Sequence, residues 1–308
     1  MAEPIQRDFL DSAVLGKLMG LPLNSRQPML GSVSGRHRSP IKGSALEFAQ
    51  YRKYVPGDDT RRLDWRTWGR TDRYYIKEFE ADTNLRLCFI IDTSGSMAYE
   101  HEGKTRLDYA RSMAGTLAYL ASQQGDAVGL YSGMSGDQNS AHQEIPAKRG
   151  PLHLRVLLDQ IGRIEAHGET QLIGAIHEAA EKISQRALIV IVSDLLFDLA
   201  PLQEAFQHLR FRKHDVTLFH LLDREEIDFD FDRPTRFVDL EGGPSLLADP
   251  SLIQKKYREA VSQYLETVDR IVNQSAIDYH RTFLDEPYDE VLARFLTGRN
   301  PKTARSAR

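Results

Sequence analysis

The sequence has few of the residues that stabilise small covalently linked domains. Its 308 residues contain one cysteine, Cys88, so neither an intramolecular disulfide nor a cysteine-rich zinc or iron–sulfur site can form. Cys88 lies in an apolar stretch, where we expect a buried small hydrophobe and not a nucleophile. The histidines lack metal-binding spacing such as His-Glu-x-x-His. A reducing compartment fits this composition best.

Long hydrophobic runs are also missing. The densest apolar run, residues 187–192, is far shorter than the roughly eighteen residues expected of a membrane-spanning helix. Residues 1–8 are polar and acidic where a signal peptide would be basic and then apolar. We therefore expect a cytoplasmic protein with no membrane partner.

The net charge of −4 hides an uneven distribution along the chain. Residues 26–77 hold twelve Lys or Arg against five Asp or Glu, whereas residues 223–241 hold eight acidic against three basic residues. Residues 299–308 are basic and rich in small residues, which predicts a disordered tail. The front of the chain is therefore basic and a late loop is acidic.

Apolar runs alternate with amphipathic stretches from about residue 85 to 298. Runs at 85–91, 127–131, 187–192, 216–222 and 277–280 predict strands, several with too little polar alternation to have a solvated face. Apolar steps of three and four within 107–121 and 172–183 predict helices between them. This alternation predicts an α/β domain with a doubly wound, mainly parallel sheet covered on both faces.

Residues 1–84 have a different character. They are rich in Arg, Gly, Ser and Pro, and they contain both tryptophans, Trp65 and Trp68. We expect an irregular or short-stranded β segment that packs on the α/β domain. Trp65 with Arg61, Arg62 and Arg66 would also suit a nucleic-acid adaptor. We do not expect nucleic-acid binding, because ion pairs with the acidic loop would use the same basic residues.

A polar motif follows the first strong strand. Asp92, Ser94 and Ser96 occupy the loop after residue 91, and ligands of open parallel sheets bind at the carboxyl ends of strands. A carboxylate and two hydroxyls are hard oxygen donors, which Mg²⁺ or Mn²⁺ prefers. The two serines also have a purely structural interpretation, because both could cap the helix after the loop.

Two further loops supply matching groups. Thr170 precedes a predicted helix, and Asp194 follows the longest apolar strand. Thr170 could instead be a helix N-cap, and Asp194 could bond turn amides. Taken in order, the five positions resemble the metal-ion-dependent adhesion site of von Willebrand factor A-type domains. That resemblance implies one Mg²⁺ (or Mn²⁺ or Ca²⁺) completed by a carboxylate of a protein partner.

A run of motifs precedes the α/β domain: Leu46-Glu-Phe48, Arg52-Lys-Tyr54-Val-Pro-Gly-Asp-Asp59, Arg61, Leu63-Asp-Trp65, Arg70 and Ile76-Lys-Glu-Phe79. Over residues 34–297 the chain resembles the domain of unknown function 58 family, which joins such a segment to a von Willebrand A-like domain. The family's frequent association with MoxR-type AAA+ ATPases implies an adaptor for assembly or maturation of client proteins. Many of its members carry transmembrane helices near the N-terminus, and we expect none here.

The sequence also contains partial matches to enzyme motifs. Gly103-Lys104-Thr105 resembles the end of a phosphate-binding loop, but Ala98 occupies the position where that loop requires its first glycine. No Gly-x-Ser-x-Gly elbow occurs. The remaining alternative is a metal-dependent phosphatase or hydrolase that uses Asp92 and Asp194 around the ion. We expect a binding protein and not an enzyme.

Overall fold

The computed structural model describes residues 7–25, 38–55, 63–71, 73–82, 85–132, 144–231, 233–238, 240 and 245–299. The chain divides into two compact units. One consists of residues 25–85, and the other combines residues 1–24 with residues 86–308.

The larger unit is built on a central sheet. In the described part of the chain this sheet has six strands in the order β12-β9-β8-β3-β6-β7, and all neighbours are parallel except β6 and β7. The strands are β3 (Arg86–Ile91), β6 (Ala127–Ser132), β7 (Glu144–Lys148), β8 (Leu188–Ser193), β9 (Asp215–Leu222) and β12 (Asp278–Phe283). The mainly parallel α/β sheet predicted from the apolar runs is confirmed. The runs lack polar alternation because β6, β8 and β9 are buried along their whole length.

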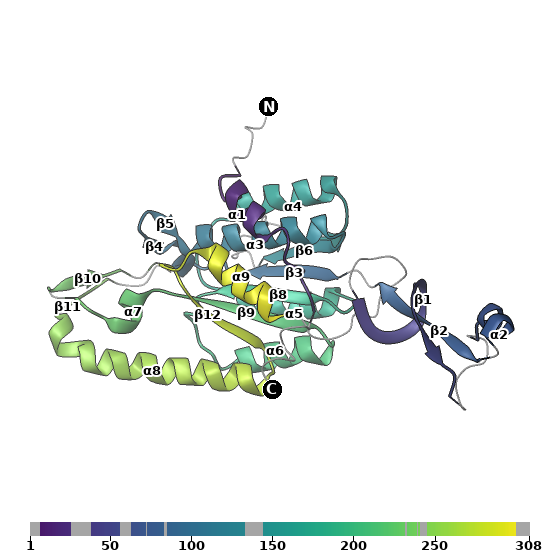
Figure 1. Ribbon diagram of the computed structural model, residues 1–308. Helices are drawn as coiled ribbons and strands as arrows, with labels where there is room; N and C mark the ends of the chain where they lie inside the picture. The colour runs from purple at the N-terminus through teal and green to yellow at the C-terminus, as the bar shows by residue number, and fades with distance from the viewer. Residues whose placement is uncertain are drawn as a thin grey trace. The chain divides into compact units, whose positions relative to one another are not determined.

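Helices cover both faces of this sheet (Figure 1). They are α1 (Ser12–Leu18), α3 (Arg106–Gln123), α4 (Pro151–Arg163), α5 (Leu172–Lys182), α6 (Leu202–Phe211), α8 (Pro250–Gln274) and α9 (Tyr288–Gly298). Helices α5, α6 and α8 pack with Cys88, Ile90 and Ile189 in one core cluster. Helix α3 contacts α1, α4 and α9 as well as β3 and β6. Because side chains alternate along β3, the residues between those of the cluster face α3.

Capping residues explain the bounds of α3, and burial explains the raised pKa of the cysteine. Helix α3 begins with a capping box between Thr105 and Asp108 and ends just before Gly125, whose φ is 84°. Cys88 is fully buried, and burial raises the pKa of its thiol to about 12. The prediction that Cys88 is buried is confirmed.

Short elements gather beyond the carboxyl ends of the strands. They are the 3-10 turn η2 (Gly95–Ala98), β4 (Glu100–His101), β5 (Lys104–Thr105), α7 (Arg224–Asp228), β10 (Thr235–Phe237) and β11 (Leu246–Ala248). Figure 1 shows α7, the β10–β11 hairpin and the start of α8 together at this end of the unit. The hairpin and the 25-residue helix α8 were not predicted.

The smaller unit is a β-hairpin with a short helix. Strand β1 (Arg38–Lys53) pairs antiparallel with β2 (Tyr75–Asp82), with several register shifts, and α2 (Trp65–Thr71) lies between them in sequence. Asp64 accepts the backbone N–H of Arg66 at 3.0 Å and so caps α2. The segment is β-structured and irregular as predicted, although its strands, of 16 and 8 residues, are longer than the short ones expected.

Arg299 is the first residue of the segment predicted to be a disordered tail, and it is buried. Its guanidinium is buried and donates to Asp215 Oδ2 at 2.9 Å and to Asp278 Oδ2 at 2.8 Å. The described chain is therefore packed through residue 299, and residues 300–308 lie outside the described residues. Searching the described helices finds none whose length and hydropathy would let it span a bilayer.

Candidate functional site

The register between β3 and β8 sets the position of Asp92. Ile91 pairs with Val192, and the N–H of Asp92 donates to the Val192 carbonyl at 2.9 Å. The side chain of Ser193, the last residue of β8, donates to Asp92 Oδ2 at 2.6 Å. Asp92 is only 1% exposed. Its carboxylate is therefore buried at the carboxyl edge of the sheet, between two neighbouring strands that lead to α3 and α6.

Backbone hydrogen bonds join the Asp92 loop to the Thr170 loop. The N–H of His167 donates to the Thr93 carbonyl at 2.9 Å, and the N–H of Gly95 donates to the Gly168 carbonyl at 2.8 Å. Gly168 has a φ of 66°, a conformation that glycine adopts without steric cost. These contacts bring Thr170 Oγ1 to 3.2 Å from Asp92 Oδ1, to which it donates.

The two serines of the motif also lie at this edge. Their Oγ atoms are 2.9 Å apart, and the N–H of Ser94 donates to Asp92 Oδ1 at 3.1 Å. Ser94 makes no side-chain cap to η2, so the capping alternative fails for it. Thr170 accepts the N–H of Leu172 at 3.2 Å near the start of α5, so it both supports the helix and contacts Asp92.

Asp194 lies in the neighbouring loop but is held by other partners. Its Oδ2 accepts from Arg106 Nη1 at 2.6 Å, and its Oδ1 accepts the N–H of Leu196 at 3.3 Å. The latter contact is the turn bond that the structural alternative predicted. The sequence therefore placed Asp194 at the correct end of the sheet and missed its ion pair.

Backbone strain accompanies this loop. Leu195 has a φ of 54°, the left-handed region that a branched side chain rarely adopts. Its N–H donates to Ser193 Oγ at 2.9 Å, and its carbonyl accepts the Tyr264 hydroxyl at 2.5 Å. His220 Nε2 donates to the Asp194 carbonyl at 2.9 Å. A strained backbone conformation that surrounding hydrogen bonds hold in place is typical of functional loops.

Arg106 is the charged residue that sequence reasoning missed. Besides Asp194 it forms an ion pair with Glu226 of α7, and its guanidinium lies 4.6 Å from the centre of the Tyr99 ring. Burial alone lowers its pKa, but Asp194 and Glu226 more than compensate, so the pKa is raised and the cation persists. One signal was available, because Arg106 opens a helix, where the dipole disfavours a cation unless anions surround it.

The electrostatics of Asp92 favour a bound cation. Burial, followed by the charge of Asp194, raises the pKa of Asp92, so ionising it there costs free energy without a compensating charge. A carboxylate and three hydroxyls, with Asp194 nearby, are the oxygen donors that Mg²⁺ or Mn²⁺ takes. Among the described residues no three His, Cys, Asp or Glu side chains converge as a metal-binding group. A cation here would depend on hydroxyl oxygens and on water.

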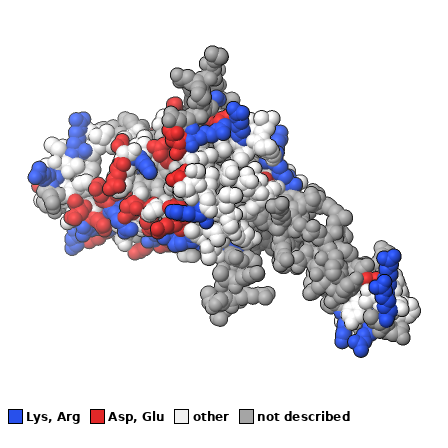
Figure 2. Space-filling view, turned by 45° about the horizontal axis from the view of Figure 1, so that its top comes forward, with Lys and Arg blue, Asp and Glu red and all other residues white. Residues whose placement is uncertain are grey.

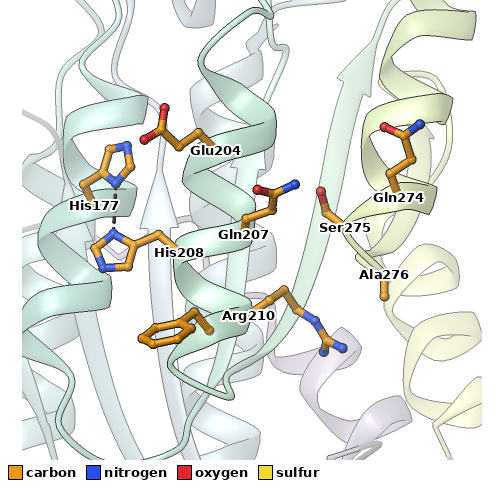
Figure 3. Close-up of a pocket in the computed structure, with 9 residues that line it drawn as sticks. His177, Glu204, Gln207, His208, Arg210, Gln274, Ser275 and Ala276 are labelled. Atoms are coloured by element: carbon orange, nitrogen blue, oxygen red, sulfur yellow. Dashed lines mark hydrogen bonds between the residues drawn. The ribbon is translucent and has the colours of Figure 1, made fainter.

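A separate concavity of about 890 Å³ lies between α5, α6 and the end of α8. In Figure 3, His177 and His208 lie next to each other in its wall and point toward one another, with their Nδ1 atoms 3.0 Å apart. At this distance one Nδ1 donates and the other accepts, so the two imidazoles satisfy each other. None of the predicted site residues lines this concavity.

The smaller unit presents a basic, aromatic surface. Figure 2 shows Lys and Arg over much of its described surface, and Trp65, Trp68 and Tyr74 are exposed. The rings of Trp68 and Tyr74 stack with centroids 5.9 Å apart. Arg61 and Arg62, named for the nucleic-acid alternative, lie outside the described residues.

Comparison with known families settles the resemblance seen in the motifs. Residues 50–267 match the family model described as protein of unknown function DUF58. The chain belongs to this family. Its membership confirms the resemblance drawn from the motifs between residues 46 and 79.

Three relatives illustrate how far the similarity of this DUF58 chain extends. An uncharacterized Mycobacterium tuberculosis protein, Rv1480, is 26% identical over 230 residues, covering 73% of this chain and 70% of that protein. An aerotolerance-related membrane protein from Bacteroides fragilis is 15% identical, with a TM-score of 0.45 over 70% of this chain and 100% of that chain. A von Willebrand factor type A structure from Catenulispora acidiphila is 17% identical, with a TM-score of 0.33 over 59% of this chain and 43% of that chain.

Proposed function

We propose that this protein is a docking module that binds a carboxylate of a protein partner through a divalent cation, Mg²⁺ or a similar ion. The observation that carries the proposal is the convergence on buried Asp92 of the Thr170 and Ser193 hydroxyls and the Ser94 N–H, with the Ser94 and Ser96 hydroxyls in contact beside them. The bound ion would supply positive charge and open coordination positions for an incoming carboxylate. Asp92 would provide the main negative charge, and Ser94, Ser96 and Thr170 neutral oxygens.

Asp194 has a supporting role in this proposal. Arg106 neutralises part of its charge, so a cation at Asp92 would meet less than the full charge of two carboxylates. A site of moderate negative charge holds a cation and still accepts a further carboxylate from outside. This charge balance suits reversible docking better than permanent metal storage.

We further propose that the partner is a MoxR-type AAA+ ATPase or a client of such an ATPase, as the family resemblance implies. In this role the module would connect the ATPase to proteins that it assembles or matures. The proposal includes a cytoplasmic location, because an ATPase partner needs ATP.

The test measures binding to a purified MoxR-type ATPase from the same organism by biolayer interferometry, without nucleotide. We expect Mg²⁺-dependent binding that weakens at least about tenfold in EDTA and in Asp92→Asn. Asp198→Asn is the matched control, because Asp198 is an exposed acid near the same edge of the sheet, where it accepts the backbone N–H of Ala200. Equal binding by Asp92→Asn and wild type would contradict metal-dependent docking, whereas no binding by any form would contradict only the ATPase as partner.

The hydrolase alternative predicts a different result. A phosphatase that uses Asp92 and Asp194 would turn over an aryl phosphate in Mg²⁺ and lose that turnover in Asp92→Asn. The docking proposal predicts no turnover in either protein. Mg²⁺-dependent turnover that disappears in the variant would favour the hydrolase.

A further inference from the structure

An aromatic cavity borders the candidate metal site. Its volume is about 440 Å³, in the range of ligand-binding pockets. Ser96, Arg106 and Leu196 line it on the side of the metal site. Aromatic rings from four segments also line it: Tyr99, Phe229, Phe231, Phe237 and Tyr257. The candidate metal site and this cavity therefore share Ser96.

The aromatic wall is already formed. Phe229 is buried and stacks on Tyr257 with ring centroids 4.1 Å apart and on Phe237 at 5.5 Å, and Phe231 meets Phe229 edge-on at 5.1 Å. The Phe229 carbonyl accepts from Gln254 Nε2 on α8 at 3.0 Å. Phe229 also has a φ of 47°, so its backbone is held in a strained conformation. A wall fixed in this way needs little ordering when a ligand binds.

The rim of the cavity is apolar and accessible. Leu196 is 46% exposed, Val238 60% and Leu240 45%. Leu246 of the β10–β11 hairpin, which pairs with the lining residue Phe237, is also exposed, so the apolar surface continues beyond the cavity. A contiguous apolar surface beside a polar site is typical of a protein-binding region.

The charges that line the cavity determine which kind of side chain can bind in it. Arg106 is its only lining cation among the described residues, and Asp194 and Glu226 already pair with that guanidinium. Glu225 adds a further negative charge at the wall. A second carboxylate would therefore be repelled from the cavity, whereas a neutral apolar side chain would bury surface against the rings.

We propose that the aromatic cavity binds a large apolar side chain, aromatic or branched aliphatic, that lies close in sequence to the carboxylate docked at the metal site. This inference rests on the metal-dependent docking proposed above. Ser96 supplies a candidate metal ligand and also lines the cavity, so an extended segment anchored at the ion passes its mouth. Since such a segment advances about 3.3 Å per residue, the apolar residue falls within about two positions of the acidic one.

The experiment selects a phage-displayed library of random dodecapeptides on the full chain in Mg²⁺. We expect enrichment of peptides with an Asp or Glu within two positions of a large apolar residue. Selection on Asp92→Asn should lose the acidic preference, and selection on Leu240→Glu should lose the apolar preference while the acidic one remains. A synthetic peptide from the wild-type selection should bind Leu240→Glu at least about tenfold more weakly.

Matched controls separate the two proposals. Leu252→Glu alters an equally apolar residue of α8 that is 79% exposed and does not line the cavity, so it should bind the peptide as wild type does. Enrichment of acidic residues without an apolar neighbour would overturn the cavity proposal and leave metal docking intact. Acidic enrichment beside the apolar residue that persists unchanged in EDTA and in Asp92→Asn would overturn metal docking and leave the cavity. No enrichment over the starting library would overturn the cavity proposal, and Mg²⁺-dependent binding of the ATPase would still test docking separately.

Discussion

Arg106 Nη1 donates to Asp194 Oδ2 at 2.6 Å, and both side chains are almost completely buried. The same guanidinium pairs with Glu226, which lines the aromatic cavity. Arg106 thus connects the candidate metal site with the neighbouring cavity. A cation that approached Asp194 would compete with Arg106 for its carboxylate, so the ion pair and the ion should be thermodynamically linked.

This linkage predicts the behaviour of Arg106→Met. Removing the guanidinium leaves buried Asp194 and partly buried Glu226 without their shared cation, which should lower the free energy of unfolding by about 3–5 kcal/mol. A bound cation would then replace the missing charge, so Mg²⁺ should raise the Tm of the variant more than that of wild type. Thermal unfolding with and without Mg²⁺ measures both effects. Equal Mg²⁺ shifts in the two proteins would show that Arg106 and the ion do not compete.

A second buried arginine tests stability away from the site. Arg299 pairs with Asp215 and Asp278, which begin strands β9 and β12 at the end of the sheet opposite Asp92. Arg299→Met should lower the free energy of unfolding by about 3–5 kcal/mol, because it removes the buried cation that the two carboxylates share. Arg294→Met, which breaks an exposed pair with Glu286, should cost at most about 1 kcal/mol. Urea unfolding compares them, and similar losses would contradict a structural role for Arg299.

The buried strands were predictable because they are apolar on both faces. The runs at 187–192 and 216–222 became β8 and β9 with bounds shifted by at most one residue, and every residue of both strands is buried. The loop positions of Asp92, Thr170 and Asp194 followed from the same strands and helices, because the carboxyl ends of parallel strands meet at one edge.

Other features depend on contacts that a single sequence does not encode locally. Arg106 was overlooked because a lone arginine carries no periodic signal, and its partners Asp194 and Glu226 are distant in sequence. Helix α8 differs from these, because its apolar residues recur at helical spacing and could have been recognised from the sequence. The strained backbone of Phe229 depends on a tertiary contact, the hydrogen bond that its carbonyl accepts from Gln254 of α8.

His214 makes stability depend on pH. Its Nδ1 accepts the N–H of Ala187 at 3.2 Å, and burial, together with Arg212 and Arg186, lowers its pKa from 6.5 to about 4. Above about pH 6.5 the imidazole is neutral in both states, and its contribution to stability is complete. As the pH falls from 6.5 toward 4, the unfolded chain takes up a proton that the folded chain refuses, so stability declines.

We expect His214→Asn to remove part of this dependence, because the amide oxygen can accept the same N–H and does not titrate. Urea unfolding of wild type between pH 7 and pH 4 should show an additional loss of about 1–3 kcal/mol relative to the variant. Parallel pH profiles for the two proteins would contradict the assignment to His214.

The central claim is that Asp92 and its neighbouring hydroxyls hold a divalent cation. Titration with Mn²⁺, followed by electron paramagnetic resonance of the free ion, measures this directly and does not depend on any partner. We predict one Mn²⁺ per wild-type chain, displaced by excess Mg²⁺, with binding lost in Asp92→Asn and retained in Asp198→Asn. Equal Mn²⁺ binding by wild type and Asp92→Asn, or no binding by wild type, would contradict the account.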